Sequence, residues 1–319
     1  MDSDKLAIGI DIGGTNTKYG IIDIEGNILH RGSIKTKDYP GINDFADALA
    51  SSLKPLISEA GGLQSIKGIG IGAPNGNFYT GNIEYAPNLH WKGIIPMAEL
   101  ISETLGLPTT LTNDANAAAM GEKKYGAAKN MRDFIVLTLG TGVGSGIFIN
   151  GQLVYGHDGF AGELGHNIII PGGRYHPGTG SHGCLEMYAS ATGVVYTAHE
   201  ILKERIDEPS LLRKYPEESI TSRIVYECAI QGDALAHEVF LRTGTILGHA
   251  MANFAMFSSP EAFILFGGLV RAGELLFHPV KVAFEENLLP IFKNKIKIIA
   301  SQLFESDAAI LGASALVRD

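Results

Sequence analysis

Asp11-Ile12-Gly13-Gly14-Thr15-Asn16-Thr17-Lys18 follows an apolar segment at residues 6–10, and a similar stretch, Leu139-Gly140-Thr141-Gly142-Val143-Gly144-Ser145-Gly146, follows another at residues 134–137. Each stretch predicts a strand, a tight turn of glycine and threonine, and a second strand. Glycine lets backbone N–H groups approach a ligand closely and adopt positive φ, so turns of this kind bind anions. One turn is a weak signal and a pair is a strong one. We expect the two turns to face each other and to hold successive phosphates of one nucleotide between two lobes.

The order of the glycine-rich segments is similar to that of a large ATPase superfamily. Residues 11–15, followed far downstream by Gly140-Thr141-Gly142, resemble the two phosphate segments of actin, hexokinase and the heat-shock ATPases. A third segment, Phe263-Ile264-Leu265-Phe266-Gly267-Gly268, resembles the adenosine-side turn of that superfamily. Each segment alone also suits an ordinary strand-to-turn junction, but three in this order favour the superfamily.

Composition narrows the class of protein. With 319 residues, 45% of them apolar and 18% charged, the chain has the length for two domains and the composition of a soluble globular protein. Residues 1–5 are polar, unlike a signal peptide, and no apolar run approaches the ~18 residues of a membrane helix. The formal charge of −9 argues against a nucleic-acid partner, and only two cysteines, Cys184 and Cys228, fit a reducing compartment. We therefore expect a cytoplasmic enzyme with no membrane or nucleic-acid partner.

Hydrophobic periodicity and turn residues predict two α/β lobes with similar strand order. In the first we expect strands at 6–10, 18–23, 28–34, 67–71 and 109–112, and helices at 42–59 and 96–105. In the second we expect strands at 134–139, 145–149, 152–155, 262–266 and 295–300, with a hairpin turn at Asn150-Gly151. Helical stretches are expected at 194–205, 222–257 and 307–316.

The first lobe has the strand order of the ribonuclease H-like half of the superfamily. The resemblance therefore implies an α/β fold of two ribonuclease H-like (actin-like ATPase) lobes, each a mixed sheet flanked by helices, with an interlobe cleft. We place the N-terminal small lobe at residues 1–117 and the C-terminal large lobe at 118–305. The C-terminal helix, 306–319, is expected to pack back on the small lobe.

Asp114 is the first candidate for chemistry. It lies where a strand ends in Asn113-Asp114 and an alanine-rich helix begins. Aspartate is a favoured helix cap, so Asp114 has a purely structural interpretation. The functional interpretation is a general base that takes the proton of an attacking hydroxyl. Phosphoryl transfer requires little more than such a base, positioning and charge neutralisation by Mg²⁺.

A second group of candidates is Glu163, His166 and Glu186, in the segments Gly162-Glu163-Leu164-Gly165-His166 and Gly183-Cys184-Leu185-Glu186. Carboxylates accept hydrogen bonds from neighbouring sugar hydroxyls, and charged acceptors make the stronger bonds. Glutamate is usually a surface residue, but the flanking glycines and the apolar residues 168–170 favour a binding site.

His176, His182 and Cys184, together with His166, invite comparison with a zinc site. Structural zinc usually takes four cysteine or histidine ligands, with two cysteines two to four residues apart. No such cysteine pair is present. The local pattern is therefore a weak signal for metal.

Together these segments resemble the ROK family of bacterial sugar kinases and sugar-responsive repressors over nearly the whole chain. The resemblance rests on residues 11–15, Ala86-Pro87-Asn88-Leu89, Asn113-Asp114-Ala115-Asn116-Ala117-Ala118, residues 139–146, Glu-Leu-Gly-His at 163–166, Gly-Cys-Leu-Glu at 183–186, and Gly267-Gly268. It implies that Asp114 activates a sugar hydroxyl, usually the 6-hydroxyl of a hexose. Other hydroxyls would be held by Asn88, Asn113, Glu163, His166 and Glu186. The nucleotide would be bound by Gly13, Gly14, Thr15, Asn16, Thr141, Gly142, Gly267 and Gly268.

The resemblance also implies cofactors and partners. Asp11 would orient hydrated Mg²⁺, ATP would be the phosphoryl donor, and the chain would form a homo-oligomer, with a dimer expected. In the family a zinc loop reads Cys-x-Cys-Gly-x-x-Gly-Cys. Here residues 177–184 read Pro-Gly-Thr-Gly-Ser-His-Gly-Cys, so Pro177 and Thr179 stand where cysteines are expected. We expect no structural zinc; the alternative is that His176 and His182 substitute as ligands.

A second departure concerns the sugar. The chain has Gly72-Ala73-Pro74-Asn75-Gly76 where the family more often has Pro-Gly directly. We therefore expect an ATP-dependent hexokinase, with glucose as the leading acceptor. Kinases for N-acetylmannosamine, N-acetylglucosamine, fructose or mannose are alternatives.

Two alternatives belong to other classes of protein. A sugar-binding regulator lacking a DNA-binding domain is one; family repressors carry such a domain before the phosphate turn, and here that turn begins at Asp11. An actin-like or chaperone ATPase is the other, but the elements at 163–166 and 186 would have no purpose in it.

Overall fold

The structure is a computed structural model, and it describes residues 5–318. The contacts between residues divide the chain into two compact units: residues 1–132, 146–162 and 301–319 form the first, and residues 133–145 and 163–300 form the second. The predicted lobes assign residues 118–132, 146–162 and 301–305 to the large lobe instead. The predicted bounds follow the repeated strand order, whereas this division follows packing. The predicted lobe bounds, 1–117 and 118–305, remain a prediction based on the similar strand order of the two lobes.

The first unit contains a five-stranded sheet in the order β3-β2-β1-β4-β7. Its first three strands, β1 (Leu6–Ile12), β2 (Thr17–Ile22) and β3 (Ile28–Ile34), form an antiparallel meander. The other two, β4 (Ile66–Ala73) and β7 (Thr109–Asn113), run parallel to β1. The predicted mixed sheet is confirmed, with strand ends shifted by a residue or two. A separate short pair is formed by β5 (Ile83–Glu84) and β6 (Ile94–Ile95).

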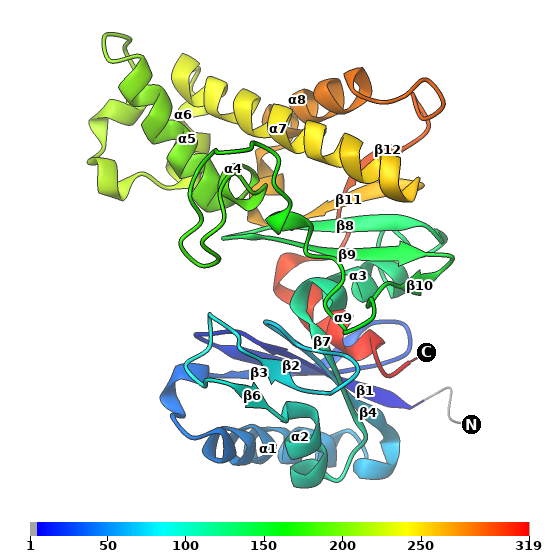
Figure 1. The fold of residues 1–319 in the computed structure, drawn as a ribbon. Coiled ribbons are helices and arrows are strands. Elements are labelled where there is room, and N and C mark those ends of the chain that lie inside the picture. Colours follow the sequence, from blue (N-terminus) through cyan, green and yellow to red (C-terminus); the bar gives the residue numbers. More distant parts are fainter. Residues whose placement is uncertain (1–4, 319) are drawn as a thin grey trace. The chain divides into compact units, whose positions relative to one another are not determined.

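Helices cover both faces of this sheet (Figure 1). On one face, α1 (Ile42–Glu59) and α2 (Met97–Leu105) bury alternate isoleucines of β1 and β4 in the main core of the unit. On the other face lie α3 (Asp114–Lys124) and α9 (Glu305–Ala315). A Cβ on Gly9 of β1 would stand 2.0 Å from the Ile310 carbonyl oxygen, so α9 approaches the strand only because glycine is there.

A second five-stranded sheet has the order β10-β9-β8-β11-β12. It comprises β8 (Phe134–Leu139), β9 (Val143–Ile149), β10 (Gln152–Leu153), β11 (Ala262–Phe266) and β12 (Lys297–Ala300). The strands β8, β11 and β12 are parallel, while β9 and β10 form a hairpin. Its turn residues Asn150 and Gly151 have φ of 54° and 80°, as the predicted type I′ turn requires.

The helices of the second unit are α4 (Glu186–Ala189), α5 (Ala191–Glu204), α6 (Ser222–Ala229), α7 (Ala234–Ser258) and α8 (Glu274–Glu286). The predicted helical stretch 222–257 is wrong in its middle, where α6 ends and α7 begins. Gly232 has φ of 86°, and the Asp233 side chain accepts a hydrogen bond from Ala236 N (2.8 Å) as the cap of α7. A positive φ and a new N-cap end one helix and start another.

Among the helices formed by residues 5–318, none combines the length and the apolar character needed to cross a bilayer.

Candidate functional site

The first glycine-rich turn links β1 to β2 and is closed by its own backbone. Asp11 pairs with Lys18 across the strands, and Gly13 N donates to Asn16 O at 3.1 Å. A Cβ on Gly14 would stand 2.3 Å from the carbonyl oxygen of Asn88. The structure therefore brings the turn against the segment that contains Asn88, two regions that the sequence analysis assigned separately to nucleotide and sugar.

Asp114 is the first residue of α3, directly after β7. The N-cap is Asn113, whose Oδ1 accepts a hydrogen bond from Ala115 N at 2.8 Å. Oδ1 of Asp114 accepts from the same N–H at 2.8 Å, and the side chain retains solvent-exposed surface. Because Asn113 is the N-cap, capping of the helix does not by itself explain why an aspartate is present at position 114.

The carboxyl of Asp11 lies within the electrostatic influence of Asp114. Burial, and after it the negative charge of Asp114, raise the pKa of Asp11 to about 6, while the positive charge of Lys18 acts in the opposite direction. Burial among the surrounding protein atoms raises the pKa of Asp114 as well, although the residue keeps exposed surface. Carboxyls with raised pKa values beside a glycine-rich turn are typical of functional sites.

The loop after β4, which departs from the family pattern, lies next to this junction. A Cβ on Gly76 would stand 2.3 Å from the carbonyl oxygen of Thr112, just before Asn113. Asn75 has φ of 50°, and its Nδ2 donates to Glu84 O at 3.0 Å. The loop is thus held by its own contacts beside the predicted sugar residue Asn113.

The second glycine-rich turn is held by residues outside it. Gly140 N donates to Gly142 O (3.0 Å), and Ala191 N and Thr192 Oγ1 donate to the carbonyls of Gly140 (2.8 Å) and Thr141 (3.0 Å). These contacts fix the turn on the first residues of α5. Nothing in the local sequence at 139–146 pointed to residues 191–192.

The predicted adenosine-side turn contacts the same region of the second unit. Gly267 has φ of 108°, and a Cβ there would stand 2.6 Å from the carbonyl oxygen of Leu139. The two predicted nucleotide segments of this unit, 140–142 and 267–268, therefore lie together.

The predicted sugar residues of the second unit gather around Val143. The 3₁₀ turn that ends in His166 approaches so closely that a Cβ on Gly165 would stand 2.0 Å from Val143 O. His166 Nε2 lies 3.8 Å from a carboxylate oxygen of Glu163. Glu186 Oε2 accepts a hydrogen bond from Val143 N at 2.7 Å. Glu163, His166 and Glu186 are thus placed beside the second glycine-rich turn.

The donors for a structural zinc are incomplete. Within residues 5–318, His166, His176 and Cys184 place potential ligand atoms within 4.8 Å of one another, and His182 is not among them. His166 Nδ1 is buried without a hydrogen-bond partner. Both ring nitrogens of His176, however, bond to protein: Nε2 to Glu186 Oε1 (2.6 Å) and Nδ1 to Gly178 N and Thr179 N (both 3.1 Å). Two donors remain where structural zinc needs four, so the residues do not fit this metal.

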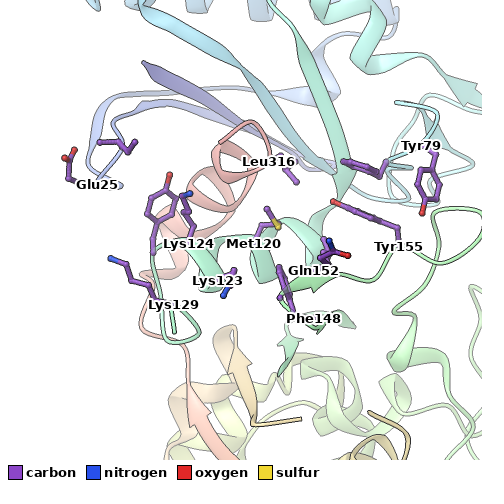
Figure 2. Close-up of a pocket in the computed structure, with 15 residues that line it drawn as sticks. Glu25, Tyr79, Met120, Lys123, Lys124, Lys129, Phe148, Gln152, Tyr155 and Leu316 are labelled. Atoms are coloured by element: carbon purple, nitrogen blue, oxygen red, sulfur yellow. The ribbon is translucent and has the colours of Figure 1, made fainter. Parts of the chain in front are cut away.

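A cavity of about 940 Å³ lies elsewhere in the first unit (Figure 2). Its aromatic end includes Phe78 and Tyr155, whose stacked ring centroids are 4.0 Å apart. Lysines from the end of α3 line it too, and there they complement the carbonyl end of the helix; Lys123 Nζ donates to Met131 O at 2.6 Å. None of the predicted site residues lines this cavity, so it is not the candidate site.

Comparison with known proteins gives the family. The model of the ROK family matches residues 7–319. The chain therefore belongs to the ROK family, and the resemblance predicted from its motifs is confirmed. A glucokinase of Halalkalibacterium halodurans is 35% identical over 99% of this chain and 96% of its own length. A xylose repressor of Bacillus spizizenii is 29% identical over 98% of this chain and 76% of its own length.

Among solved structures, a ROK family glucokinase from Streptomyces griseus in complex with glucose and AMPPNP has a TM-score of 0.79 to this chain. It is 33% identical, over 98% of this chain and 99% of that one. The similarity confirms the predicted fold class, mixed α/β with two sheets flanked by helices.

Proposed function

We propose that this chain transfers the γ-phosphoryl group of ATP to the 6-hydroxyl of glucose, with Asp114 as general base. Its class, an ATP-dependent sugar kinase, is that of its glucokinase relatives and of the S. griseus enzyme that binds glucose and AMPPNP. One observation in this chain carries the proposal: a carboxyl at the start of α3, beside a second carboxyl and the first phosphate turn, has a raised pKa.

In the proposed reaction, the sugar hydroxyl oxygen bonds to the γ-phosphorus of ATP as the bond to the ADP oxygen breaks. The hydroxyl proton passes to Asp114. A base works best when its pKa is near the working pH, so the raised pKa of Asp114 makes it a better proton acceptor than an ordinary aspartate.

The remaining site residues are proposed to position the substrates. Carboxylates and amides accept hydrogen bonds from sugar hydroxyls, and glycine turns present N–H groups to phosphates. The sugar would be held by Asn88, Asn113, Glu163, His166 and Glu186. The nucleotide would be held by Gly13, Gly14, Thr15, Asn16, Thr141, Gly142, Gly267 and Gly268.

Asp11 is proposed to hold Mg²⁺ through the water molecules of the ion. Its carboxyl suits a hard cation that keeps several waters, and a cation there would offset the mutual repulsion of Asp11 and Asp114. When bound, Mg²⁺ neutralises charge on the transferred phosphoryl group.

Other acceptors and one other class of protein are the alternatives. The loop at residues 72–76 departs from the family pattern, which favours testing N-acetylmannosamine, N-acetylglucosamine, fructose and mannose beside glucose. The xylose repressor relative keeps a sugar-binding regulator as the competing class. A homodimer and a cytoplasmic location are further parts of this proposal.

The test is a coupled assay of ADP release across these sugars, with size-exclusion chromatography for the oligomeric state. We expect glucose to give the highest kcat/KM. Binding of a sugar without ADP release would favour the regulator, and ADP release that ignores every sugar would contradict the kinase.

A further inference from the structure

The carboxylate of Glu186 is held at both oxygens. Oε2 accepts from Val143 N at 2.7 Å, and a Cβ on Gly142 would stand 2.2 Å from that oxygen. Oε1 receives the Nε2 bond of His176 at 2.6 Å. The side chains of Glu186 and His176 are 21% and 12% exposed, so this bond is largely shielded from water. Shielded, charge-assisted hydrogen bonds are the stronger kind.

The loop around His176 determines which of its nitrogens carries a proton. Nδ1 faces the backbone N–H groups of Gly178 and Thr179, which can only donate, so Nδ1 acts as acceptor. The proton of the neutral ring is then on Nε2, where it points at Glu186. The ring is further enclosed by Gly178, since a Cβ there would stand 3.0 Å from His176 Cε1.

We propose that His176 is a positioning residue that aims Glu186 at the sugar by a protein hydrogen bond, in a loop that binds no structural zinc. The Glu186 carboxylate cannot rotate without losing the bond to His176 or the bond to Val143 N. One histidine closes the loop through Nδ1 and orients the carboxylate through Nε2. This inference rests on the proposed function, because the group that it positions is proposed to bind sugar.

Two substitutions separate the roles of the two nitrogens. The amide of glutamine reaches about as far as Nε2, so His176→Gln keeps a donor toward Glu186 and loses the Nδ1 acceptor. The amide of asparagine lies about where Nδ1 lies, so His176→Asn keeps the loop acceptor and loses the donor. His182→Asn is the matched control, because His182 is in the same loop and its Nδ1 contacts Gly173 O (3.2 Å) instead of Glu186.

The readout is the KM and kcat for glucose, or for the best sugar of the panel, with the affinity for that sugar measured by calorimetry. We expect His176→Asn to raise KM about tenfold, the loss of one charge-assisted hydrogen bond, with little change in kcat. His176→Gln should stay within about threefold of the parent, and His182→Asn should match the parent. Equal KM changes in the two His176 variants, or none in either, would overturn the positioning role.

The absence of structural zinc from the loop is tested on the parent protein, and this test does not depend on which sugar the protein uses. Metal analysis of protein purified without chelator should find well below one zinc per chain, and dialysis against 1,10-phenanthroline should leave the melting temperature unchanged. One zinc per chain, with a lower melting temperature after chelation, would overturn the metal-free loop. A panel in which no sugar is phosphorylated would instead contradict the proposed function, and these metal measurements would still stand.

Discussion

The two glycine-rich turns of this protein are similar in sequence and are held in different ways. The first is closed by its own backbone bond from Gly13 to Asn16 and adjoins the carboxyls of Asp11 and Asp114. The second also has a backbone bond of its own, from Gly140 to Gly142, and it is held in addition from outside by α5 and by Glu186.

This difference indicates that the two turns have different structural roles. The first turn positions the carboxyls of Asp11 and Asp114. The environment that raises the pKa of Asp11 lowers the stability of the folded state. The second places neutral backbone N–H groups, and its conformation depends on distant residues. Selected substitutions in the two turns should therefore have unequal effects.

The largest effect is expected at Asp114, beside the first turn. Asp114→Asn keeps an acceptor for Ala115 N but cannot take a proton, so kcat should fall by about 10²–10⁴-fold. Steady-state kinetics measure this loss, and calorimetry should show sugar affinity within about threefold of the parent. The control is Asp47→Asn, on the exposed side of α1, which should leave both unchanged. Near-normal turnover of Asp114→Asn would remove the base assignment.

A smaller effect is expected on stability, when a methyl group is added to the backbone of each turn. In Gly14→Ala the new Cβ would stand 2.3 Å from the backbone of Asn88, so we expect a loss of about 1–3 kcal/mol of unfolding free energy. In Gly140→Ala the new Cβ has no heavy atom within 4 Å, and the change should be within about 0.5 kcal/mol. Urea denaturation of both variants measures the difference. Equal losses would show that the two turns are packed alike.

The smallest effect concerns the charge on Asp11. Its pKa of about 6 in the fold exceeds the ordinary value of 3.8, so the folded state holds its proton longer than the unfolded state. Stability therefore falls as pH rises from about 4 to about 6 and stays reduced above that range. Asp11→Asn imitates the protonated acid. It should be more stable than the parent by on the order of 1 kcal/mol at pH 8, after allowance for partial solvent exposure, and equal to it near pH 4.

Urea denaturation without Mg²⁺ or nucleotide, at pH 4.5, 6 and 8, tests this pH dependence. A gain that is largest at low pH, or is independent of pH, would contradict the raised pKa of Asp11.

Much of the fold was predictable because its signals are local. Short apolar runs between turn residues predicted the strands of both sheets, and Asn150-Gly151 predicted a turn whose two positive φ angles other residues rarely adopt. The break between α6 and α7 was missed, although Gly232-Asp233 carried the usual signal of a helix end and a new cap. The break was obscured because the helical spacing of apolar residues continues on both sides of it.

The candidate site was only partly predictable. The motifs at 11–15, 113–118, 163–166 and 183–186 predicted its residues, and membership of the ROK family is confirmed. The contact of Gly14 with Asn88 was not predicted, because the two are far apart in sequence. His176 was considered only as a replacement metal ligand, and its bond to Glu186 was not foreseen.

The residue pattern along the chain was sufficient for the family, the order of strands and the two glycine turns, because steric limits and hydrogen-bonding capacity act over a few neighbouring residues. The tertiary structure alone decided that Asp11 has a pKa of about 6 and that one histidine holds Glu186. Burial, charge repulsion and side-chain hydrogen bonds depend on which distant atoms packing brings within a few ångströms, and no local pattern encodes those distances.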